Sequence, residues 1–507
     1  MTKFMPLLHA EWTKFRTVRG WVITMVVAIL ATIGVGLLGH DGCGFSTSPG
    51  TVSACPALPT GPGGEAVQDA FYFAHQPLTG NGTITAQLTS LTGQYAPGQA
   101  AAGQSSLKPD GLQPWSKAGI IIKEDTSQGS AYAAMMVTGS NGVRMQWDYV
   151  NDTPGLAGSV SAASPRWLRL VRTGDVILGY DSADGTHWTL VDKVTLPRLT
   201  STVQAGLFAA SPGYTFTTDS GLGHGSGGGG PVLATAVFRH VGVSWPASGW
   251  TGTNVGGNGP NGVGVPGAFT QSAGTIRVSG SGDIAPAQPG NSLWNALVGS
   301  FAGLIALIVV GAVFITAEYR RGLIRISLTA SPRRGRLLAA KAVVIGAVSF
   351  VTGLIAAILA IAIGRHSLTA FGAPLLPIPT STEVRMIVGT ALLLAVAAVL
   401  ALAIGTIMRR SVATVATVIV VIFIPYLLTF VPNLLPQGVA DWVLRLTPAA
   451  GFAIQQPFPA YPQVGGASYL PAAGYYPLAP WAGFAVECAW AVAALVLAAY
   501  LLRRRDA

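Results

Sequence analysis

The segment 293-LWNALVGSFAGLIALIVVGAVFITAEYRR-321 decides the structural class of this protein. Its first part, residues 293–317, carries no charged side chain, whereas Arg320 and Arg321 follow closely behind it. A helix of about 20 apolar residues spans the ~30 Å hydrocarbon core of a bilayer. Basic side chains commonly anchor the end of such a helix at the membrane surface. The segment therefore predicts a membrane-spanning helix.

Five other apolar runs have the same character: 21–38, 342–363, 386–408, 412–431 and 481–502. Pro425 interrupts one of them, which neighbouring helices in a bundle can tolerate. No small-residue cleavage signature of the A-x-A type follows the first run, so we expect an uncleaved helix and not a signal peptide. Only 10% of all residues are charged, against about 25% in soluble domains. The chain is therefore predicted to form an α-helical bundle with six membrane spans.

The distribution of Lys and Arg predicts the orientation of these spans. Sixteen basic residues flank the spans on the side that includes the N-terminus, whereas Arg365, Arg385 and Arg445 are the three on the other side. Cytoplasmic flanks carry the excess of basic residues. We therefore expect both termini in the cytoplasm, residues 39–292 outside the cell, and a multi-pass protein of the plasma membrane. The net charge of +10 then reflects membrane anchoring and does not indicate nucleic-acid binding.

The stretch between the first two spans has a different composition. After a linker over 39–65, residues 66–290 are rich in Gly, Ser and Thr, and turn signals recur every 8–12 residues. Strands are predicted over 83–88, 118–123, 132–138, 143–149, 167–172, 176–181, 187–194 and 203–209. Many short strands without helical periodicity indicate an extracellular antiparallel β-sandwich. The glycine-rich stretch 221–230 is expected to be a loop or hinge.

Several runs in this region resemble concanavalin-like jelly-roll domains, related to lectins and laminarinases. They are WSKAGIIIKE over 115–124, GVRMQW over 142–147 and GYDSADGTHW over 179–188. The laminarinase pattern Glu-x-Asp-x-x-Glu is missing from the sequence, and the domain holds only Glu65 and Glu124, so glycoside hydrolysis is not expected. Arg144, Gln146 and Asp148 point away from the predicted buried face and are candidates for glycan contact. The alternative is a domain that contacts protein or binds nothing.

Three other features carry alternatives. Cys43 and Cys55 follow the first span and are either joined in a disulfide or left as two thiols, and no metal-ligand spacing accompanies them. Glu487 lies in the sixth span, where a carboxylate costs ~2.5 kcal/mol or more. It is therefore expected either to face the bundle on a substrate path or to lie near the outer headgroups. The outer connection 433–480 is predicted to contain a short surface helix over 438–446.

The N-terminal segment, residues 1–20, is predicted to form an amphipathic helix at the inner membrane surface. Phe4, Leu8, Trp12 and Phe15 share one face, and Glu11 is expected elsewhere on the wheel, with Lys14 and Arg16. The alternative is a frayed, charged N-terminus. The loop 318–341 likewise mixes apolar and basic residues and is broken by Pro332 and Gly335. Such an element can dock in a groove of a cytosolic partner.

Both segments resemble one family. The pattern Glu-Tyr-Arg-x-Gly-x-Ile-Arg over 318–325, with Pro-Arg-Arg over 332–334 and Lys341, resembles the coupling loop of type-2 ATP-binding-cassette (ABC-2) permeases, and residues 9–17 resemble their start. The resemblance implies a separate ATPase subunit that binds ATP and Mg, and a homodimer or heterodimer of permeases. By this resemblance, residues of the loop contact or orient the ATPase or form its turn: Glu318, Tyr319, Arg320, Arg321, Arg325, Pro332, Arg333, Arg334 and Arg336. The alternative is that these arginines only set the membrane topology.

Three functions were compared on these grounds. A permease is favoured by the spans and the loop. A membrane-anchored protein that recognises a glycan or a protein through its β-domain is the alternative. An enzyme is not expected, because the sequence contains no G-x-x-x-x-G-K-S/T phosphate loop and no cluster of carboxylates or metal ligands. The chain itself is accordingly expected to need no cofactor.

Overall fold

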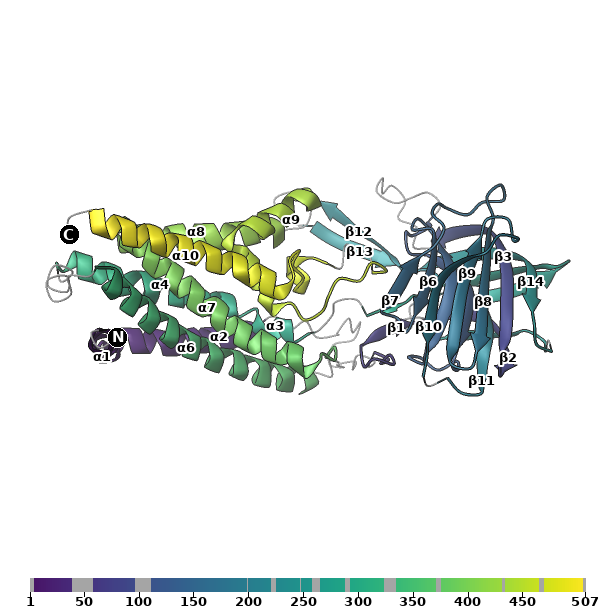
Figure 1. Cartoon of the computed structure of the whole chain (residues 1–507), viewed down its shortest axis with the longest axis horizontal. Coiled ribbons are helices and arrows are strands. Elements are labelled where there is room, and N and C mark those ends of the chain that lie inside the picture. Colours follow the sequence, from purple (N-terminus) through teal and green to yellow (C-terminus); the bar gives the residue numbers. More distant parts are fainter. Residues whose placement is uncertain are drawn as a thin grey trace. The chain divides into compact units, whose positions relative to one another are not determined.

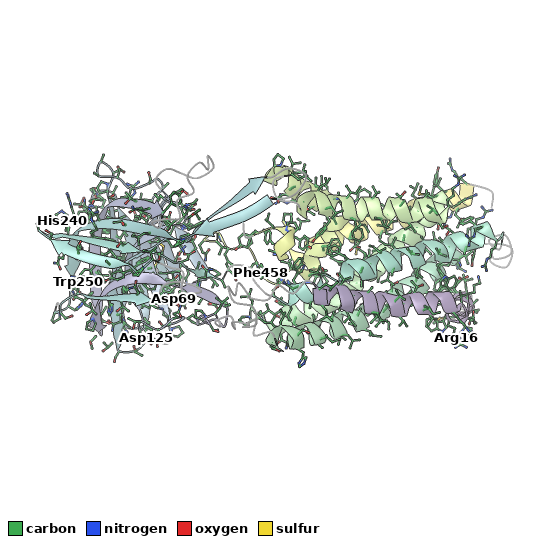
Figure 2. All side chains as sticks on the ribbon, turned by 180° about the vertical axis from the view of Figure 1, so that it is seen from behind. Arg16, Asp69, Asp125, His240, Trp250 and Phe458 are labelled. Carbon is green, nitrogen blue, oxygen red and sulfur yellow. The ribbon has the colours of Figure 1, made fainter. Side chains whose placement is uncertain are left out.

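A computed structural model describes residues 4–38, 58–95, 111–197, 199–219, 225–246, 248–257, 265–287, 292–322, 334–370, 375–430, 434–464 and 469–504. The chain divides into two compact units, and many of their elements are labelled in Figure 1. The helical unit comprises Met1–Cys55, Pro289–Ala460 and Ala467–Ala507, and the β unit comprises Pro56–Gln288 and Tyr461–Gly466. Side chains of both units are drawn in Figure 2, where Arg16 marks the end of the first helix and Asp69 marks the first strand.

The helical unit consists of long helices joined by short ones. Its elements are α1 (Met5–Thr17), α2 (Arg19–Leu38), α3 (Leu293–Leu297), α4 (Ser300–Arg320), α6 (Arg334–Ala370), α7 (Thr380–Met408), α8 (Ser411–Phe430), α9 (Gln437–Leu446), the 3₁₀ helices η2 (Pro448–Gln455) and η4 (Pro471–Ala473), and α10 (Pro480–Arg504). Six helical stretches among the described residues are long and apolar enough to cross a membrane, with α3 and α4 counted as one. This confirms the predicted number of spans.

The arrangement of these helices explains their composition. α7 and α4 are the most buried of the six candidate spans, and α2 and α10 are among the least buried. The outward faces of α2 and α10 nevertheless remain apolar, with Val22, Ile23 and Leu30 exposed on α2 and Val492 and Val496 exposed on α10. A surface of this kind requires lipid or another apolar partner in place of water.

Local sequence sets several helix boundaries. Ser292 and Asn295 form a capping box at the start of α3, which satisfies backbone N–H groups that lack partners inside the helix. Pro379 precedes α7 and Pro436 precedes α9. Gly322, at φ 66°, follows α4 and adopts the left-handed conformation that glycine tolerates best.

The β unit is a sandwich of two seven-stranded antiparallel sheets. One sheet has the order β10-β9-β8-β3-β14-β17-β16 and the other β15-β2-β11-β4-β5-β6-β7. Two-stranded pairs are formed by β1 with β18 and by β12 with β13. The strands are β1 (Val67–Asp69), β2 (Phe71–Thr79), β3 (Gly82–Tyr95), β4 (Lys117–Lys123), β5 (Tyr132–Thr138), β6 (Val143–Trp147), β7 (Asn151–Pro154), β8 (Arg166–Thr173), β9 (Val176–Ser182), β10 (Thr189–Thr195), β11 (Thr202–Ala210), β12 (Tyr214–Asp219), β13 (Gly225–Gly230), β14 (Val232–Val243), β15 (Thr251–Val255), β16 (Ala268–Ser272), β17 (Thr275–Gly280) and β18 (Ile284–Pro286).

Alternation along the strands builds the core between the sheets. Ile84, Ala86 and Leu88 on β3 face Ile120 and Ile122 on β4 within one cluster of buried side chains. A second cluster covers the other face of the sheet that contains β4, and it includes Phe73, Ile121 and Phe208. β4 is therefore buried on both faces, which explains why every one of its residues is buried.

One prediction about this unit was wrong. The glycine-rich stretch 221–230 was expected to be a loop or hinge, but Gly225–Gly230 forms β13 and pairs with β12. Glycines carry no side-chain alternation, so sequence patterns cannot reveal a strand that is held only by its backbone hydrogen bonds. Residues 221–224 lie outside the described part of the chain.

Candidate functional site

Four charged side chains from three helices meet in the helical unit, and we call them the charge cluster. Lys341 Nζ on α6 lies 2.7 Å from Glu11 Oε2 on α1 and 2.7 Å from Glu318 Oε1 on α4. Lys14 Nζ on α1 lies 2.8 Å from Glu11 Oε1 and 3.2 Å from Glu318 Oε1. Two carboxylates and two ammonium groups thus alternate, and each charge has an opposite charge next to it.

The cluster is buried at one end and open at the other. Lys341 is 0% exposed and Glu11 is 1% exposed, whereas the Lys14 side chain is 43% exposed. The Lys341 ammonium group also lies 4.8 Å from the centre of the Phe314 ring. Burial lowers the pKa of Lys14, but its hydrogen bond to Glu11 and the charge of Glu318 outweigh that effect and leave the pKa raised. Removing one member of a buried ion pair leaves its partner as an unpaired buried charge, which destabilises the fold far more than an unpaired charge in water.

The position of Glu11 on α1 differs from the prediction. Glu11 was expected away from the apolar face, yet Glu11 and Phe15 are the buried residues of this helix. Trp12, which was expected on the apolar face, is 45% exposed. The prediction was wrong because an unpaired carboxylate would avoid an apolar face, and Lys341, which neutralises it here, is remote in sequence. Phe15 packs beside Glu11 against Trp21 and Phe314.

The residues assigned by resemblance to the coupling loop divide into several groups. Glu318 is buried within the charge cluster, and Tyr319 lies under the guanidinium group of Arg409, 5.2 Å from the ring centre. Arg320, Arg321 and Arg336 are exposed. Arg334 is half-buried, and its Nη1 donates to the Leu502 carbonyl oxygen at 2.7 Å, which ties the start of α6 to the end of α10. Arg325, Pro332 and Arg333 lie outside the described residues.

Sequence reasoning missed the roles of Glu11 and Lys341 as partners. A signal was present, because Glu11 is the only acidic residue of the segment 1–20 and Lys341 stands between the apolar stretches 337–340 and 342–345. Charges in such positions usually have an opposite charge as partner. The pattern could not say which one, since Lys341 and Glu11 are 330 positions apart.

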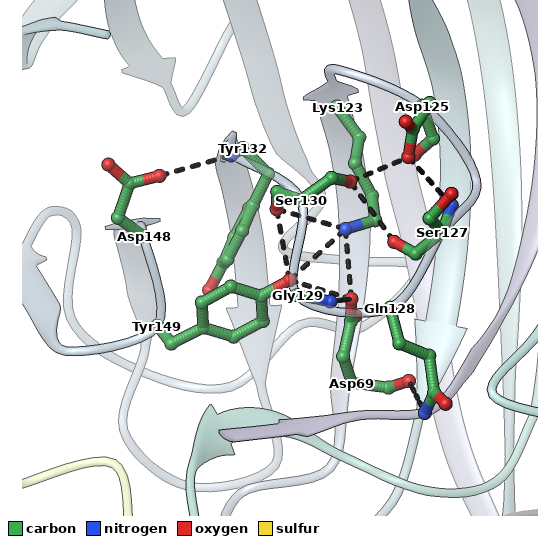
Figure 3. Close-up of polar contacts among 10 residues, drawn as sticks. All are labelled: Asp69, Lys123, Asp125, Ser127, Gln128, Gly129, Ser130, Tyr132, Asp148 and Tyr149. Carbon is green, nitrogen blue, oxygen red and sulfur yellow. Dashed lines mark hydrogen bonds and ion pairs between the residues drawn. The ribbon is translucent and has the colours of Figure 1, made fainter. Parts of the chain in front are cut away.

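A second polar network lies in the β unit (Figure 3). Its Tyr132 and Tyr149 belong to the buried cluster on the other face of the β4 sheet from the core between the sheets. Lys123 Nζ on β4 pairs with Asp69 Oδ2 on β1 at 2.9 Å, and both side chains are fully buried. The Tyr149 hydroxyl donates to the same Asp69 oxygen at 2.6 Å. The backbone N–H of Gly129 also donates to Asp69 Oδ2, at 2.9 Å. Asp69 is thus held by three donors.

Buried ion pairs fix β1 and β18, the first and last strands of the unit. β1 and β18 pair with each other, with Val67 opposite Pro286. On β4, Lys123 binds Asp69 at the end of β1, and Lys117 lies 2.7 Å from Asp283, just before β18. Two buried ion pairs on one strand therefore hold both connections of the β unit.

A third segment joins the same network. Gln463, which belongs to the β unit although it comes from the connection between α9 and α10, is fully buried. Its Nε2 donates to the Tyr149 carbonyl oxygen at 2.9 Å. Residues 433–480 were expected to form one outer connection, but Tyr461–Gly466 within it belongs to the β unit.

A cavity of about 310 Å³ lies beside this network. Its lining includes Glu65 and Asp148, together with Asn151 and Leu196. Burial raises the pKa of Asp148 to about 6, and the nearby charge of Glu65 adds to this effect. Burial also raises the pKa of Glu65. Asp148 and Tyr149 both have positive φ, 45° and 64°, a conformation that costs free energy for residues other than glycine.

The three candidates for glycan contact do not share one environment. Asp148 lines the cavity and accepts a hydrogen bond from the Tyr132 backbone N–H. Arg144 and Gln146 both bind Asp152 on β7, and Gln146 is fully buried. Arg144 and Gln146 are therefore directed to a partner within the unit.

The remaining candidates lie elsewhere. Glu487 is buried in the helical unit, on the inner face of α10. Cys488 is a free cysteine that lines an apolar groove of about 450 Å³ between α6, α7 and α10. Cys43 and Cys55 lie outside the described residues, so their pairing stays a prediction. In the described ranges, no three His, Cys, Asp or Glu residues are grouped as metal ligands would be.

Comparison with known proteins shows one family. The sequence matches the family described as "ABC-2 family transporter protein" over residues 5–507, which includes the β unit. No curated protein is significantly similar to the chain in sequence.

Several solved structures are similar to part of the chain. A scytalido-glutamic peptidase with a transition state analog inhibitor is 13% identical and covers 42% of this chain and 98% of its own, with a TM-score of 0.26. A functionally unknown protein from Saccharomyces cerevisiae is 14% identical and covers 41% of this chain and 95% of its own, with a TM-score of 0.22. A lectin from Bauhinia forficata in complex with GalNAc is 11% identical and covers 30% of this chain and 78% of its own, with a TM-score of 0.19. Likenesses this distant carry no argument about activity.

Proposed function

This chain belongs to the ABC-2 family of transporter proteins, and from that premise we propose that it moves its substrate with energy from a separate ATPase that docks on the loop 318–341. The chain is the permease, the non-catalytic membrane subunit. ATP and Mg bind to the ATPase in this proposal. The docking loop and both termini lie in the cytoplasm, and the β unit lies outside the cell.

The charge cluster is the observation that supports this proposal. Glu318 is the first residue of the loop and Lys341 is its last, and the two side chains are joined at 2.7 Å. Lys341 also binds Glu11 on α1. A force applied to the loop by an ATPase would therefore reach α1, α4 and α6 together, because the ion pairs join these helices close to the loop. A loop that only set the topology would not need such a connection.

The exposed arginines supply a docking surface. Arg320 ends α4, Arg321 follows it, and Arg336 lies in the first turn of α6. All three are exposed. Their guanidinium groups fit carboxylates of a partner protein. Glu318, by contrast, is occupied inside the chain, so we assign it to positioning the loop and not to contact with the ATPase.

Dimerisation with a second permease is part of the proposal. The exposed apolar faces of α2 and α10 are suited either to lipid or to another permease subunit, identical or different. Single cysteines placed on the exposed face of α2 or of α10 can be crosslinked in membranes. The face whose cysteine yields a crosslinked dimer is the one that contacts the second permease.

Copurification tests the docking surface. We expect an ATPase with a phosphate loop to copurify with the solubilised chain and to be lost from the triple variant R320E/R321E/R336E. The matched control is R277E, which reverses an exposed arginine on β17 of the β unit and should keep the ATPase. Equal ATPase retention by both variants would contradict the proposal.

A second function is supported by one observation, the cavity lined by Glu65 and Asp148. Recognition of an extracellular glycan or protein by the β unit would use this cavity, which is within the size range of small-ligand sites, about 300–1,000 Å³. Binding of the full chain to a glycan array, with D148N as the comparison, tests it. Binding that is lost in D148N supports recognition through this cavity, and binding that is unchanged in D148N places the contact elsewhere.

A further inference from the structure

Glu487 lies on the one buried stripe of an otherwise exposed helix. Gly483, Glu487 and Ala491 recur every four residues along α10 and are all buried. Glu487 is 1% exposed, and its Oε2 has no hydrogen-bond partner within the described residues. Of the two alternatives left by the sequence, the structure supports a carboxyl group that faces the bundle.

The 3₁₀ helix η2 covers this carboxyl group. All residues of Pro448–Gln455 are buried. Two glycines permit the close approach, since a Cβ added to Gly451 would overlap Glu487 Oε2 and a Cβ added to Gly483 would overlap the Ala450 carbonyl oxygen. The middle of η2 therefore rests directly on the Glu487 side chain.

The end of η2 is tethered separately. Gln455 Nε2 donates to Ser300 Oγ on α4 and to Thr390 Oγ1 on α7, both at 3.0 Å. Gln455 is fully buried. The short helix is thus fixed to the bundle by neutral hydrogen bonds at one end, and Glu487 is the ionisable group against its middle.

Charged partners of Glu487 are missing from the described part of the bundle. The elements packed against α10 are η2, α6, α7 and α9. η2 has no titratable side chain, and those of the others are Arg334, Arg336, Lys341, Arg365, His366, Glu383, Arg385, Asp441 and Arg445. Lys341 pairs with Glu11 and Glu318, and Arg365 pairs with Glu383. No ion pair within the described ranges includes Glu487, and the thiol of the adjacent Cys488 supplies no positive charge.

We propose that Glu487 is a proton-binding site of the helical unit. While η2 is packed against it, the carboxyl group holds a proton, because an ionised carboxylate buried without a partner is strongly disfavoured. When η2 withdraws and water reaches Oε2, the group releases that proton to water and becomes a carboxylate. One proton is bound or released and no other bond changes.

Linkage fixes the direction of the effect. Since the packed state binds the proton more tightly, acid favours packed η2 and alkali favours withdrawn η2. The inference does not depend on the ATPase partner, because it concerns an equilibrium of the permease alone.

Thiol labelling of η2 tests this equilibrium. Ala449 on η2 is fully buried, and Ala449→Cys in a background with Cys43→Ser, Cys55→Ser and Cys488→Ser supplies one reporter. The full chain in lipid nanodiscs is labelled with a water-soluble maleimide from mildly acidic to mildly alkaline pH. The same reporter with Glu487→Gln is the control, because it shares the thiol chemistry and has a side chain of the same size that cannot ionise.

The ratio of the two labelling rates decides the matter. We expect the reporter with Glu487 to label several-fold faster than its E487Q control in alkali and at the same rate in acid. A ratio that does not change with pH overturns the proposal. Infrared spectra give a second measurement that needs no reporter. A protonated-carboxyl band at neutral pH should be lost in E487Q and kept in E383Q, and a wild-type spectrum without a band that E487Q removes would also overturn it.

Discussion

Lys341 Nζ lies 2.7 Å from Glu11 Oε2, although the two residues are 330 positions apart in the chain. The contact joins the N-terminal helix α1 to α6, at the last residue of the loop 318–341. Because both side chains are buried, neither charge can be compensated by water if the other is removed. The stability of this end of the helical unit therefore depends on the pair.

Replacing Lys341 by Met should destabilise the helical unit. The change leaves Glu11 and Glu318 without their buried partner, and breaking a buried ion pair costs about 3–5 kcal/mol. Thermal unfolding of the solubilised chain measures this loss. K14M is the comparison and should cost less, since the Lys14 side chain is 43% exposed and Glu11 and Glu318 keep Lys341 as a partner. Equal losses in K341M and K14M would show that burial does not set the energetics of the cluster.

Replacing Tyr149 by Phe should destabilise the β unit by about 1.5–3 kcal/mol, the usual range for a hydrogen bond to a charged group. The variant removes the 2.6 Å bond from the hydroxyl to Asp69 Oδ2 and changes little else in the packing. Near-ultraviolet circular dichroism on heating follows the loss. Tyr180 on β9 is only half-buried, so Y180F should unfold at the same temperature as the wild type. If Y149F also unfolded at the wild-type temperature, the hydrogen bond to Asp69 would not contribute to the stability of the β unit.

The stability of the β unit should fall as pH rises from about 4 to about 6 through the titration of Asp148. Burial raises the pKa of this carboxyl group to about 6 in the folded chain, above the unfolded value of about 3.9. The folded state therefore binds more protons in this window, and raising the pH weakens it.

D148N tests this pH dependence. The variant removes the ionisation, so above this window it should be more stable than the wild type, by at most about 1–2 kcal/mol because Asp148 is partly solvated. Unfolding free energies measured in acid and at neutral pH provide the comparison. A wild-type stability that rises across the window by as much as that of D148N would contradict the assigned direction.

Replacing Gly451 by Ala should destabilise the contact between η2 and α10 by about 1–3 kcal/mol, the usual cost of overpacking. The added methyl group would overlap Glu487 Oε2. Gly438 on α9 has open space around its Cα, so G438A is the matched control and should be neutral or slightly stabilising. Adding E487A to G451A removes the overlap, and the two substitutions should then cost less together than the sum of their separate effects.

Much of the fold could be predicted from composition and period. Six apolar runs and a polar, turn-rich insertion between the first two are properties of local sequence, and each has its counterpart in the structure. The strand Gly225–Gly230 was missed because its residues have no side chains to alternate. The packing of Gln463 into the β unit was missed because one glutamine in a Pro- and Gly-rich connection carries no periodic signal.

The candidate site was predictable only in part. The sequence pointed to the loop 318–341 and to Glu487, and the structure places Glu318 and Glu487 in buried positions. The sequence could not distinguish Glu318, which pairs with Lys341 inside the chain, from Arg320 and Arg321, which are exposed. Their difference arises from contacts with α1 and α6.

The sequence by itself determined that this protein needs a lipid phase, how many helices could cross it, and which family it belongs to. Each of these rests on a continuous stretch, because transfer from water to hydrocarbon is a sum over neighbouring residues. Only the tertiary structure decided that Glu11 meets Lys341, that Lys117 and Lys123 hold the ends of the β unit, and that η2 covers Glu487. A buried charge depends on the one opposite charge or contact within a few ångströms, and chain order does not specify which remote residue supplies it.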